Sequence, residues 1–232
     1  MYLAEWLQDV LNLFFPQSCA CCGKKLCKSE TILCVFCEYN LPQTNAHLFH
    51  DSPLAMLFWG RIRVSNVAAL YIFQKGGRVQ RLIHQFKYQG KKEIGEKAGR
   101  LFGQFLAQSE TIRTADLIVP VPLHPKKKKK RGYNQSDYFA KGLSESLGIP
   151  WSDNVVQRLI NSSSQTRRKS RYERWENVRD IFKVGNPELI RQKHVLLVDD
   201  VITTGSTMEA CASALFSAGS AQISAVGMAH SH

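Results

Sequence analysis

Two neighbouring acids, Asp199 and Asp200, follow a short apolar stretch, Val195 to Val198. Unbroken apolar runs of this length are typical of strands that are buried on both faces of a parallel sheet. Ionised carboxylates only accept hydrogen bonds, which suits the 2′ and 3′ hydroxyls of a ribose. The pair is therefore a candidate for holding a sugar.

Hydroxyl side chains around one glycine follow the acids, and the Ala-rich segment after them predicts a helix over 206–217. The free amides and the dipole at a helix start attract anions, and glycine lets backbone approach a ligand closely. We predict a site for the 5′-phosphate of a sugar at Thr203, Thr204, Gly205, Ser206 and Thr207. The alternatives are a purely structural helix start or a nucleotide hydrolase. The hydrolase needs a GxxxxGK[ST] loop, which the sequence lacks.

A run of six cations follows another predicted strand, 117–121, and three prolines. The carboxyl ends of parallel strands share one edge of a sheet, so we expect the run to begin near the acids. It is either a solvated surface loop or a clamp for a departing diphosphate. Its members are Lys126, Lys127, Lys128, Lys129, Lys130 and Arg131.

Cations interleaved with aromatic residues form a third candidate, between Gln165 and Asn177. Such a segment could be a helix with a charged face, a mobile active-site lid or a stacking surface for single-stranded nucleic acid. The residues that we single out in it are Arg167, Arg168, Arg171, Arg174 and Trp175.

Six of the seven cysteines lie between residues 19 and 37. The sequence shows no export signal, so metal binding is favoured over disulfide bonds. Two Cys-x-x-Cys pairs separated by eleven residues predict a tetrahedral and therefore structural zinc site with the ligands Cys19, Cys22, Cys34 and Cys37. Cys21 and Cys27 compete with these residues for a place among the ligands.

The chain as a whole is basic and has an ordinary globular composition. Its 232 residues include 31 Lys and Arg against 19 Asp and Glu, a net charge of +12. This excess favours a polyanionic partner, either nucleic acid or diphosphate. No stretch approaches the roughly 18 apolar residues of a membrane span. We expect a cytoplasmic protein without a membrane span.

Strand and helix patterns alternate from residue 67 onward and predict an α/β domain with a mostly parallel sheet flanked by helices. Strands are expected at 67–73, 117–121, 155–160, 195–198 and 223–228. Helices are expected at 79–87, 94–107, 135–147 and 206–217.

Four units are expected along the chain. An apolar stripe at helical spacing predicts an amphipathic helix over 1–16. A zinc-binding module over 17–45 comes next, too small for a core without metal. A linker or cover over 46–66 and the α/β domain over 67–232 complete the chain.

Taken in order, these motifs resemble the ComF/GntX family, in which a four-cysteine zinc module precedes a type I phosphoribosyltransferase domain. The matching pieces are the four predicted zinc ligands, Pro120-Val-Pro-Leu, Arg131-Gly-Tyr-Asn-Gln, Gln165 with Arg174 and Asn177, and Leu197-Val-Asp-Asp-Val-Ile-Thr-Thr-Gly-Ser-Thr. The last motif marks type I phosphoribosyltransferases in general, and its combination with the cysteines narrows the resemblance. The additional thiols Cys21 and Cys27 depart from the family pattern.

The resemblance implies phosphoribosyl diphosphate (PRPP) as ligand, Mg²⁺ with it, and a role in natural competence, the handling of incoming single-stranded DNA. It implies a glycosyltransferase that releases diphosphate and passes the phosphoribosyl group to an unnamed acceptor, with Asp199 and Asp200 as catalytic residues. Other competence proteins are implied partners. The alternative is a non-catalytic sensor of PRPP or 5′-phosphate that binds single-stranded DNA with the help of zinc.

Overall fold

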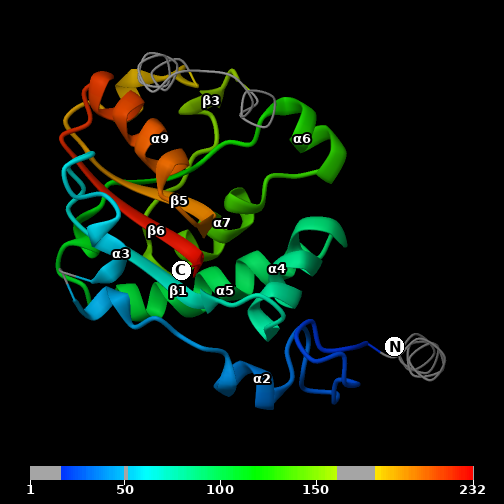
Figure 1. Ribbon diagram of the computed structural model, residues 1–232. Helices are drawn as coiled ribbons and strands as arrows, with labels where there is room; N and C mark the ends of the chain where they lie inside the picture. Colours follow the sequence, from blue (N-terminus) through cyan, green and yellow to red (C-terminus); the bar gives the residue numbers. More distant parts are fainter. Residues whose placement is uncertain (1–16, 50–51, 161–180, 232) are drawn as a thin grey trace.

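A four-stranded parallel sheet in the order β1-β6-β5-β2 forms the centre of the protein (Figure 1). The computed structural model describes residues 17–49, 52–160 and 181–231. The strands of the sheet are β1 (Val67–Phe73), β2 (Leu117–Pro120), β5 (His194–Ile202) and β6 (Gln222–Ser231). The helix predicted over 1–16 lies outside the described residues, as does the arginine-rich segment 161–180.

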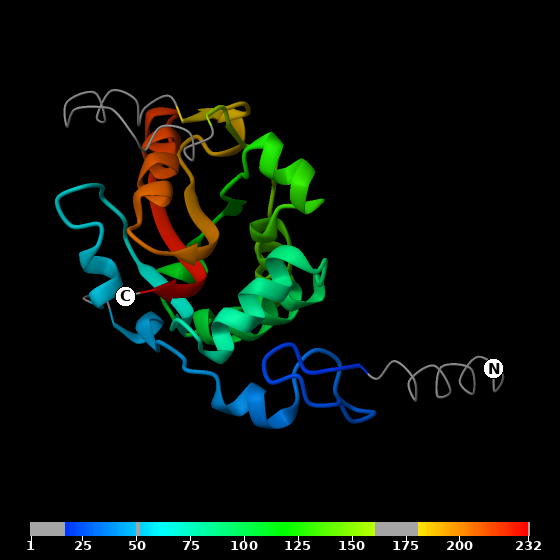
Figure 2. The same ribbon diagram turned by 45° about the vertical axis from the view of Figure 1, so that its right-hand side comes forward.

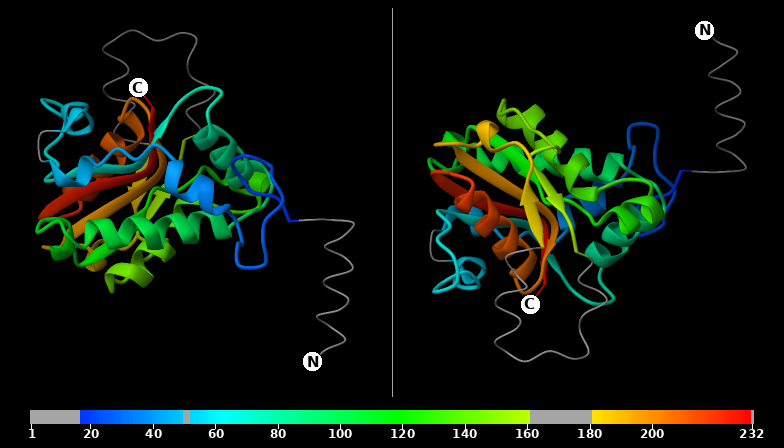
Figure 3. Two further views of the ribbon diagram at one scale, coloured as in Figure 1. Left: turned by 90° about the horizontal axis from the view of Figure 1, so that it is seen from below. Right: turned by 90° about the horizontal axis from the view of Figure 1, so that it is seen from above.

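Helices cover both faces of this sheet because successive side chains of each strand point to opposite sides. In β1, Ala68 and Leu70 lie in one buried cluster, and Val67 and Ala69 lie in the other. The first cluster lies under α4 (Arg78–Tyr88), α5 (Glu93–Leu106) and α7 (Gln135–Leu147). The second lies under α9 (Ser206–Ser217). Figure 3 shows the two layers on either side of the strands.

Glycines let α5 and α7 pack closely. A Cβ added at Gly99 would collide with the backbone of Phe139, and one at Gly142 would collide with the backbone of Glu96. This contact holds α7 firmly against the sheet, and the first turn of α7 points toward the ends of β2 and β5.

The cation run is a helix, α6 (Pro125–Arg131), so the predicted loop is wrong here. Proline suits the first helical position because its missing N–H needs no partner there. His124 caps the start, since its Nδ1 accepts a hydrogen bond from the backbone N–H of Lys126 at 3.2 Å. Gly132, with φ of 82°, ends the helix in the left-handed region. The local signals therefore overcome the mutual repulsion of the cations.

The strand predicted over 155–160 exists in shorter form and outside the main sheet. It is β3 (Val156–Arg158), which pairs in antiparallel fashion with β4 (Phe182–Val184). A strand of three residues carries too little alternation to be seen in a sequence, so β4 was not predicted. The segment 161–180 connects these two strands.

Residues 17–49 lie beside α4 and α5, on the side of the molecule away from α9 (Figure 2). Gln85 Nε2 on α4 donates to the carbonyl oxygen of Ala20 at 3.0 Å, and Lys97 Nζ on α5 lies 2.8 Å from Glu38 Oε2. The module contains one α-helix, α2 (Val35–Asn40). The short helices elsewhere are η1 (Ala46–Leu48), α3 (Pro53–Met56), η2 (Ile112–Thr114) and η4 (Pro187–Leu189). None of the helices in the described ranges has the length and apolar character to cross a membrane.

Candidate functional site

The two acids stand within β5, not beyond its end as predicted. The strand continues to Ile202 because β6 continues beside it, pairing Asp199 with Gly227 and Ile202 with His230. The acids nevertheless lie at the carboxyl edge of the sheet, since β2 stops one residue earlier, at Pro120 opposite Val198.

Side chains from two helices contact the acid pair. Ser136 Oγ, in the first turn of α7, donates to Asp199 Oδ1 at 3.1 Å. The backbone N–H of Asp200 donates to the same oxygen at 2.8 Å. Lys87 Nζ, at the end of α4, lies 2.9 Å from Asp200 Oδ2 in a largely buried ion pair.

Burial raises the pKa of Asp199 to about 7, and the negative charge of Asp200 adds to the rise. The hydrogen bond from the N–H of Asp200, the charge of Lys87 and the hydrogen bond from Ser136 act in the opposite direction. Near neutral pH, Asp199 therefore exchanges its proton readily while Asp200 is paired with a cation. Such a pair can accept hydrogen bonds from hydroxyl groups and can compensate positive charge.

The segment that leads from β2 into the run of cations begins beside β5, next to the acids. The backbone N–H of Val121 donates to the carbonyl of Val198 at 2.8 Å, which holds the start of this segment against β5. Asn134, ahead of α7, donates from Nδ2 to the carbonyl of Val121 at 3.1 Å and so connects the start of α7 to the same edge.

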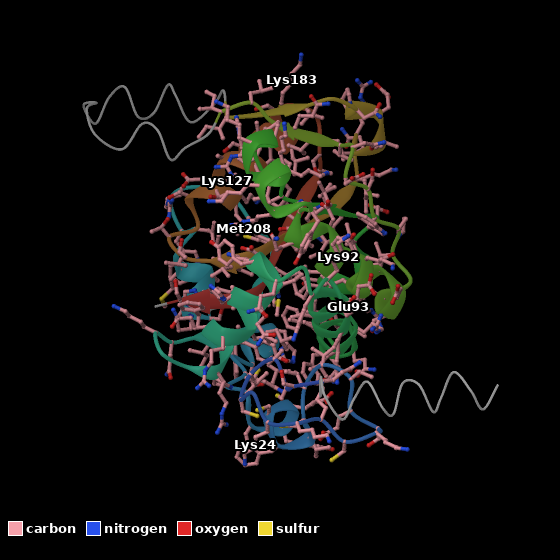
Figure 4. All side chains as sticks on the ribbon, turned by 90° about the vertical axis from the view of Figure 1, so that its right-hand side faces the viewer. Lys24, Lys92, Glu93, Lys127, Lys183 and Met208 are labelled. Carbon is pink, nitrogen blue, oxygen red and sulfur yellow. The ribbon has the colours of Figure 1, made fainter. Side chains whose placement is uncertain are left out.

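The six cations of α6 differ in how exposed their side chains are. Lys127 and Arg131 are half-buried and one turn apart on the same face, and Lys126, Lys128, Lys129 and Lys130 are exposed. Arg131 Nη1 donates to Gln135 Oε1 at 2.8 Å. Figure 4 shows Lys127 on the face of the molecule where α6 lies.

Further cations surround Lys127. Burial lowers its pKa, and the charges of Arg158, Arg131 and Lys87 lower it further. Arg158, on β3, is close enough to Asp199 for that carboxylate to favour its charged form. Four cations from α4, α6 and β3 thus lie near one another, and two of them, Lys87 and Arg158, are beside the acid pair, an arrangement that suits a multiply charged anion.

The loop after β5 exposes Thr203, Thr204 and Ser206, and Thr207 is half-buried. Gly205 stands at the N-cap of α9 with φ of 74°, a conformation that favours glycine. A Cβ at Gly205 would lie only 3.0 Å from Cζ of Phe58, a buried residue of the segment before β1. The five predicted loop residues are thus adjacent at one helix start, with their hydroxyls accessible.

Arg61, in the segment before β1, also reaches the site, since its Nη1 donates to the carbonyl of Thr204 at 2.9 Å. Lys87, Ser136, Arg158 and Arg61 were not singled out in the sequence. Each is far along the chain from the acids or the loop that it lies near, and none belongs to a spaced motif. Ser136 had the best available signal, because it directly follows the Arg131-Gly-Tyr-Asn-Gln motif. The predicted lid or nucleic-acid residues Arg167, Arg168, Arg171, Arg174 and Trp175 lie outside the described residues.

Four cysteines come together as the pair spacing predicts. The sulfur atoms of Cys19, Cys22, Cys34 and Cys37 all lie within 4.8 Å of one another. The Sγ atoms of Cys22 and Cys34 are 3.7 Å apart, which fits the roughly 3.8 Å between sulfurs that share a tetrahedral zinc at about 2.3 Å. The cluster could therefore hold a metal ion. Among the described residues, Cys21 is buried outside this cluster and Cys27 is exposed.

Comparison with protein families matches residues 135–231 to the phosphoribosyl transferase domain. The matched region contains α7, both acids, the hydroxyl loop and α9. The domain match, the parallel sheet and the flanking helices make this a type I phosphoribosyltransferase fold. Lys87, α6 and Arg61 come from outside the matched region.

Curated relatives extend the similarity upstream. DNA utilization protein YhgH of Escherichia coli strain K12 is 30% identical over 214 residues, which is 88% of this chain and 86% of that protein. Competence protein F of Haemophilus influenzae is 36% identical over 154 residues, 64% of this chain and 66% of that one. DNA utilization protein YhgH of Salmonella typhimurium is 33% identical over 145 residues, 61% and 63% of the two chains. The matches to the last two proteins span less than two thirds of their lengths.

Among solved structures, the chain is similar to a glutamine PRPP amidotransferase from B. subtilis complexed with ADP and GMP. The similarity has a TM-score of 0.44 at 22% identity and covers 62% of this chain and 30% of that one.

Proposed function

Because this chain belongs to the ComF family of proteins with a phosphoribosyltransferase domain, we propose that it binds PRPP with Mg²⁺ and transfers the phosphoribosyl group with release of diphosphate. The observation that carries the proposal is the meeting of three features at one sheet edge. These are the acid pair, the hydroxyl loop at the start of α9, and the cations gathered around Lys127.

The 5′-phosphate is assigned to the loop 203–207. Amides in the first turn of a helix have no acceptor within the helix, and the exposed hydroxyls of Thr203, Thr204 and Ser206 can add donors. The ribose then lies between this loop and the acids, so that Asp199 and Asp200 accept hydrogen bonds from its 2′ and 3′ hydroxyls.

The diphosphate is assigned to the cations. Lys127 and Arg131 present the inner face of α6, and Lys87 and Arg158 approach from α4 and β3. When bound, Mg²⁺ supplies charge that stabilises the departing phosphates. Asp199 and Asp200 are the carboxylates that would hold it.

In the reaction, the bond between C1 of the ribose and the diphosphate oxygen breaks, and its electron pair leaves with the diphosphate. The positive charge that develops on the ribose is then stabilised by the neighbouring carboxylates, as in glycoside hydrolysis. The acceptor supplies the electron pair for the new bond at C1. The four-cysteine cluster is assigned a structural zinc, because four protein ligands leave no open position on the metal.

The test is isothermal titration with PRPP and Mg²⁺, together with an assay of diphosphate release with candidate bases and amines. We expect the wild-type protein to bind PRPP and the double variant Asp199→Asn/Asp200→Asn to lose turnover. Glu188→Gln, which changes an exposed acid of η4, is the matched control. Full turnover by the double variant would refute the assignment of the acids.

A second candidate is the binding of single-stranded DNA, in line with the names of the relatives. Lys24 and Lys183 are exposed and Lys92 and Lys127 are half-buried, and Figure 4 shows these four lysines spread over the height of the molecule. Phe36 and Tyr39 on α2 are 58% and 83% exposed and could stack on bases. A salt titration with a labelled oligonucleotide tests this candidate, because phosphate contacts make affinity fall steeply with salt. No binding at low salt would refute it.

A further inference from the structure

A segment outside the matched domain contacts the hydroxyl loop. Residues 52–66 begin with α3 and continue to β1, and the buried residues Leu54, Ala55 and Phe58 join the core beneath α9. The ring of Phe58 lies directly beside Gly205. The hydroxyl loop therefore packs against a part of the chain that precedes the first strand of the sheet.

Arg61 connects this segment to the loop through its guanidinium group. Its Nη1 donates to the carbonyl of Leu57 at 2.8 Å, within its own segment, and to the carbonyl of Thr204 at 2.9 Å. Its Nη2 donates to Ser206 Oγ at 3.2 Å and pairs with Glu209. The side chain is 35% exposed, so it lies at the surface of the loop that is assigned to the phosphate.

These contacts determine which loop atoms face an incoming anion. The carbonyl oxygen of Thr204, an acceptor that would repel a phosphate oxygen, is occupied by Arg61. The Ser206 hydroxyl oxygen accepts from Nη2, so its proton must point elsewhere. Thr204 Oγ1 and Ser206 Oγ are 3.0 Å apart. Whichever of these two donates to the other, one hydroxyl proton is left to donate to a ligand.

Arg61 also supplies positive charge. Among the described residues, α9 has an acid but no base in its first turn, and that acid is Glu209. The carboxylate of Glu209 occupies one side of the guanidinium group. Phosphate and carboxylate are recognised by the same fork of N–H donors.

We propose that Arg61 is a positioning residue for the 5′-phosphate, which occupies the acceptor atoms of Thr204 and Ser206 and adds charge that Glu209 partly neutralises. The proposal rests on the proposed function of the loop. It explains why a phosphorylated sugar would be preferred over the same sugar without phosphate. It also means that residues 52–66 contribute a side chain to the phosphate site.

The test compares binding of ribose 5-phosphate and ribose by isothermal titration in four variants. We expect Arg61→Gln to bind ribose 5-phosphate about tenfold more weakly, because it removes a positive charge beside the loop and frees the carbonyl of Thr204 to repel the phosphate. Arg61→Lys keeps the charge but not the fork, and we expect a loss of about threefold. Glu209→Gln should bind about two- to threefold more tightly, since it removes a competing negative charge. Binding of ribose should be equally weak in all of them.

Arg191→Gln is the matched control, because Arg191 forms a comparable ion pair with Glu188. This pair is more exposed: the side chain of Arg191 is 60% exposed and that of Glu188 is 72% exposed. If Arg61 had a purely structural role, removing either partner of the Arg61–Glu209 ion pair would weaken binding of ribose 5-phosphate to the same extent. Equal weakening by Arg61→Gln and Glu209→Gln would therefore overturn the proposal, as would unchanged affinity in Arg61→Gln. Should Arg61→Gln fail to fold, Glu209→Gln decides: tighter binding supports the proposal, and equal or weaker binding overturns it.

The two proposals can fail separately. A wild-type protein that binds neither ribose 5-phosphate nor PRPP with Mg²⁺ refutes the proposed function, and the role of Arg61 falls with it. A wild-type protein that binds both, with Arg61 variants of the same affinity, refutes only the role of Arg61.

Discussion

At the scale of single residues, the protonation of Asp199 makes ligand binding depend on pH. Its pKa is raised to about 7 by burial and by the charge of Asp200. If the ionised pair holds the ribose and Mg²⁺, affinity for PRPP with Mg²⁺ should rise as the pH passes through about 7 and then level off. Titration calorimetry across this range measures the midpoint.

The variant Asp200→Asn tests the cause of that shift. It removes a like charge from beside Asp199 and leaves Lys87 free to favour the ionised form, so the midpoint should move to lower pH. Lys141→Met, which breaks an ion pair with Glu96 remote from the acids, should leave the midpoint in place. An unmoved midpoint in Asp200→Asn would contradict our account of Asp199.

The same shift affects folding with a definite sign. A carboxyl group whose pKa is raised in the folded protein holds a proton that the unfolded chain has released. Asp199 therefore contributes stability at acid pH, and this contribution is lost as the pH rises from about 4 to about 7. PRPP with Mg²⁺ should offset the loss, because it binds the ionised form.

The residues of the site that are adjacent in the sequence could be predicted, and those that meet only in the fold could not. Asp199, Asp200 and the loop 203–207 form one continuous motif whose chemistry can be recognised without a structure. Lys87 and Arg61 reach the same place from α4 and from the segment before β1. Neither has a spacing that relates it to the acids, so only the packing of helices on the sheet reveals them.

At the scale of elements, the two sides of α6 should differ in function. We expect Lys127→Gln/Arg131→Gln to weaken binding of diphosphate about tenfold, because the two side chains share the half-buried face of α6 and Lys127 lies near Lys87 and Arg158. Lys129→Gln/Lys130→Gln removes the same charge from the exposed side of the helix and should change affinity less than about twofold. Similar losses in the two double variants would mean that the run acts only through its total charge.

The close contact between α5 and α7 should limit what can replace glycine. Gly142→Ala places a Cβ against the backbone of Glu96, and overpacking of this kind costs about 1–3 kcal/mol. The higher helix propensity of alanine offsets about 1 kcal/mol of this cost. Because the contact is with backbone, which cannot move aside, we expect the upper end of this cost and a net loss of about 1–2 kcal/mol in the free energy of unfolding, measured in urea. At Gly185 an added Cβ finds no neighbour nearer than 3.7 Å, so Gly185→Ala is the control and should be nearly neutral. Equal stability of the two variants would contradict the close packing.

Strong periodic patterns placed several elements correctly. Residues 67–73, 135–147 and 206–217 have the predicted bounds because each combines a clear apolar period with a terminating signal such as Gly148. The prediction was wrong in α6, where the repulsion between cations and the capping signals favour different structures. In α6, Pro125, His124 and Gly132 form a helix from a sequence whose lysine content indicates a solvated loop.

At the scale of the whole molecule, the metal should stabilise more than its own module. The buried residues around the cysteine cluster belong to the same core as α4 and α5. We expect a chelator or Cys37→Ser to lower the melting temperature and to release bound zinc, because metal binding energy is folding energy in so small a module. Cys27→Ser, at an exposed thiol outside the cluster, should retain both zinc and stability. Unchanged melting after metal release would contradict the coupling.

The position of β6 has a consequence for biosynthesis. This strand is translated after β1 and β5, yet it lies between them, pairing Val67 with Ala225 on one side and His194 with Gln222 on the other. While the ribosome still holds residues 222–231, β1 has no partner in the sheet, and its edge can attract other nascent chains. Completion of the sheet is thus delayed until after the acid pair has been made, and chaperones that shield open strand edges should matter for the yield of this protein in cells.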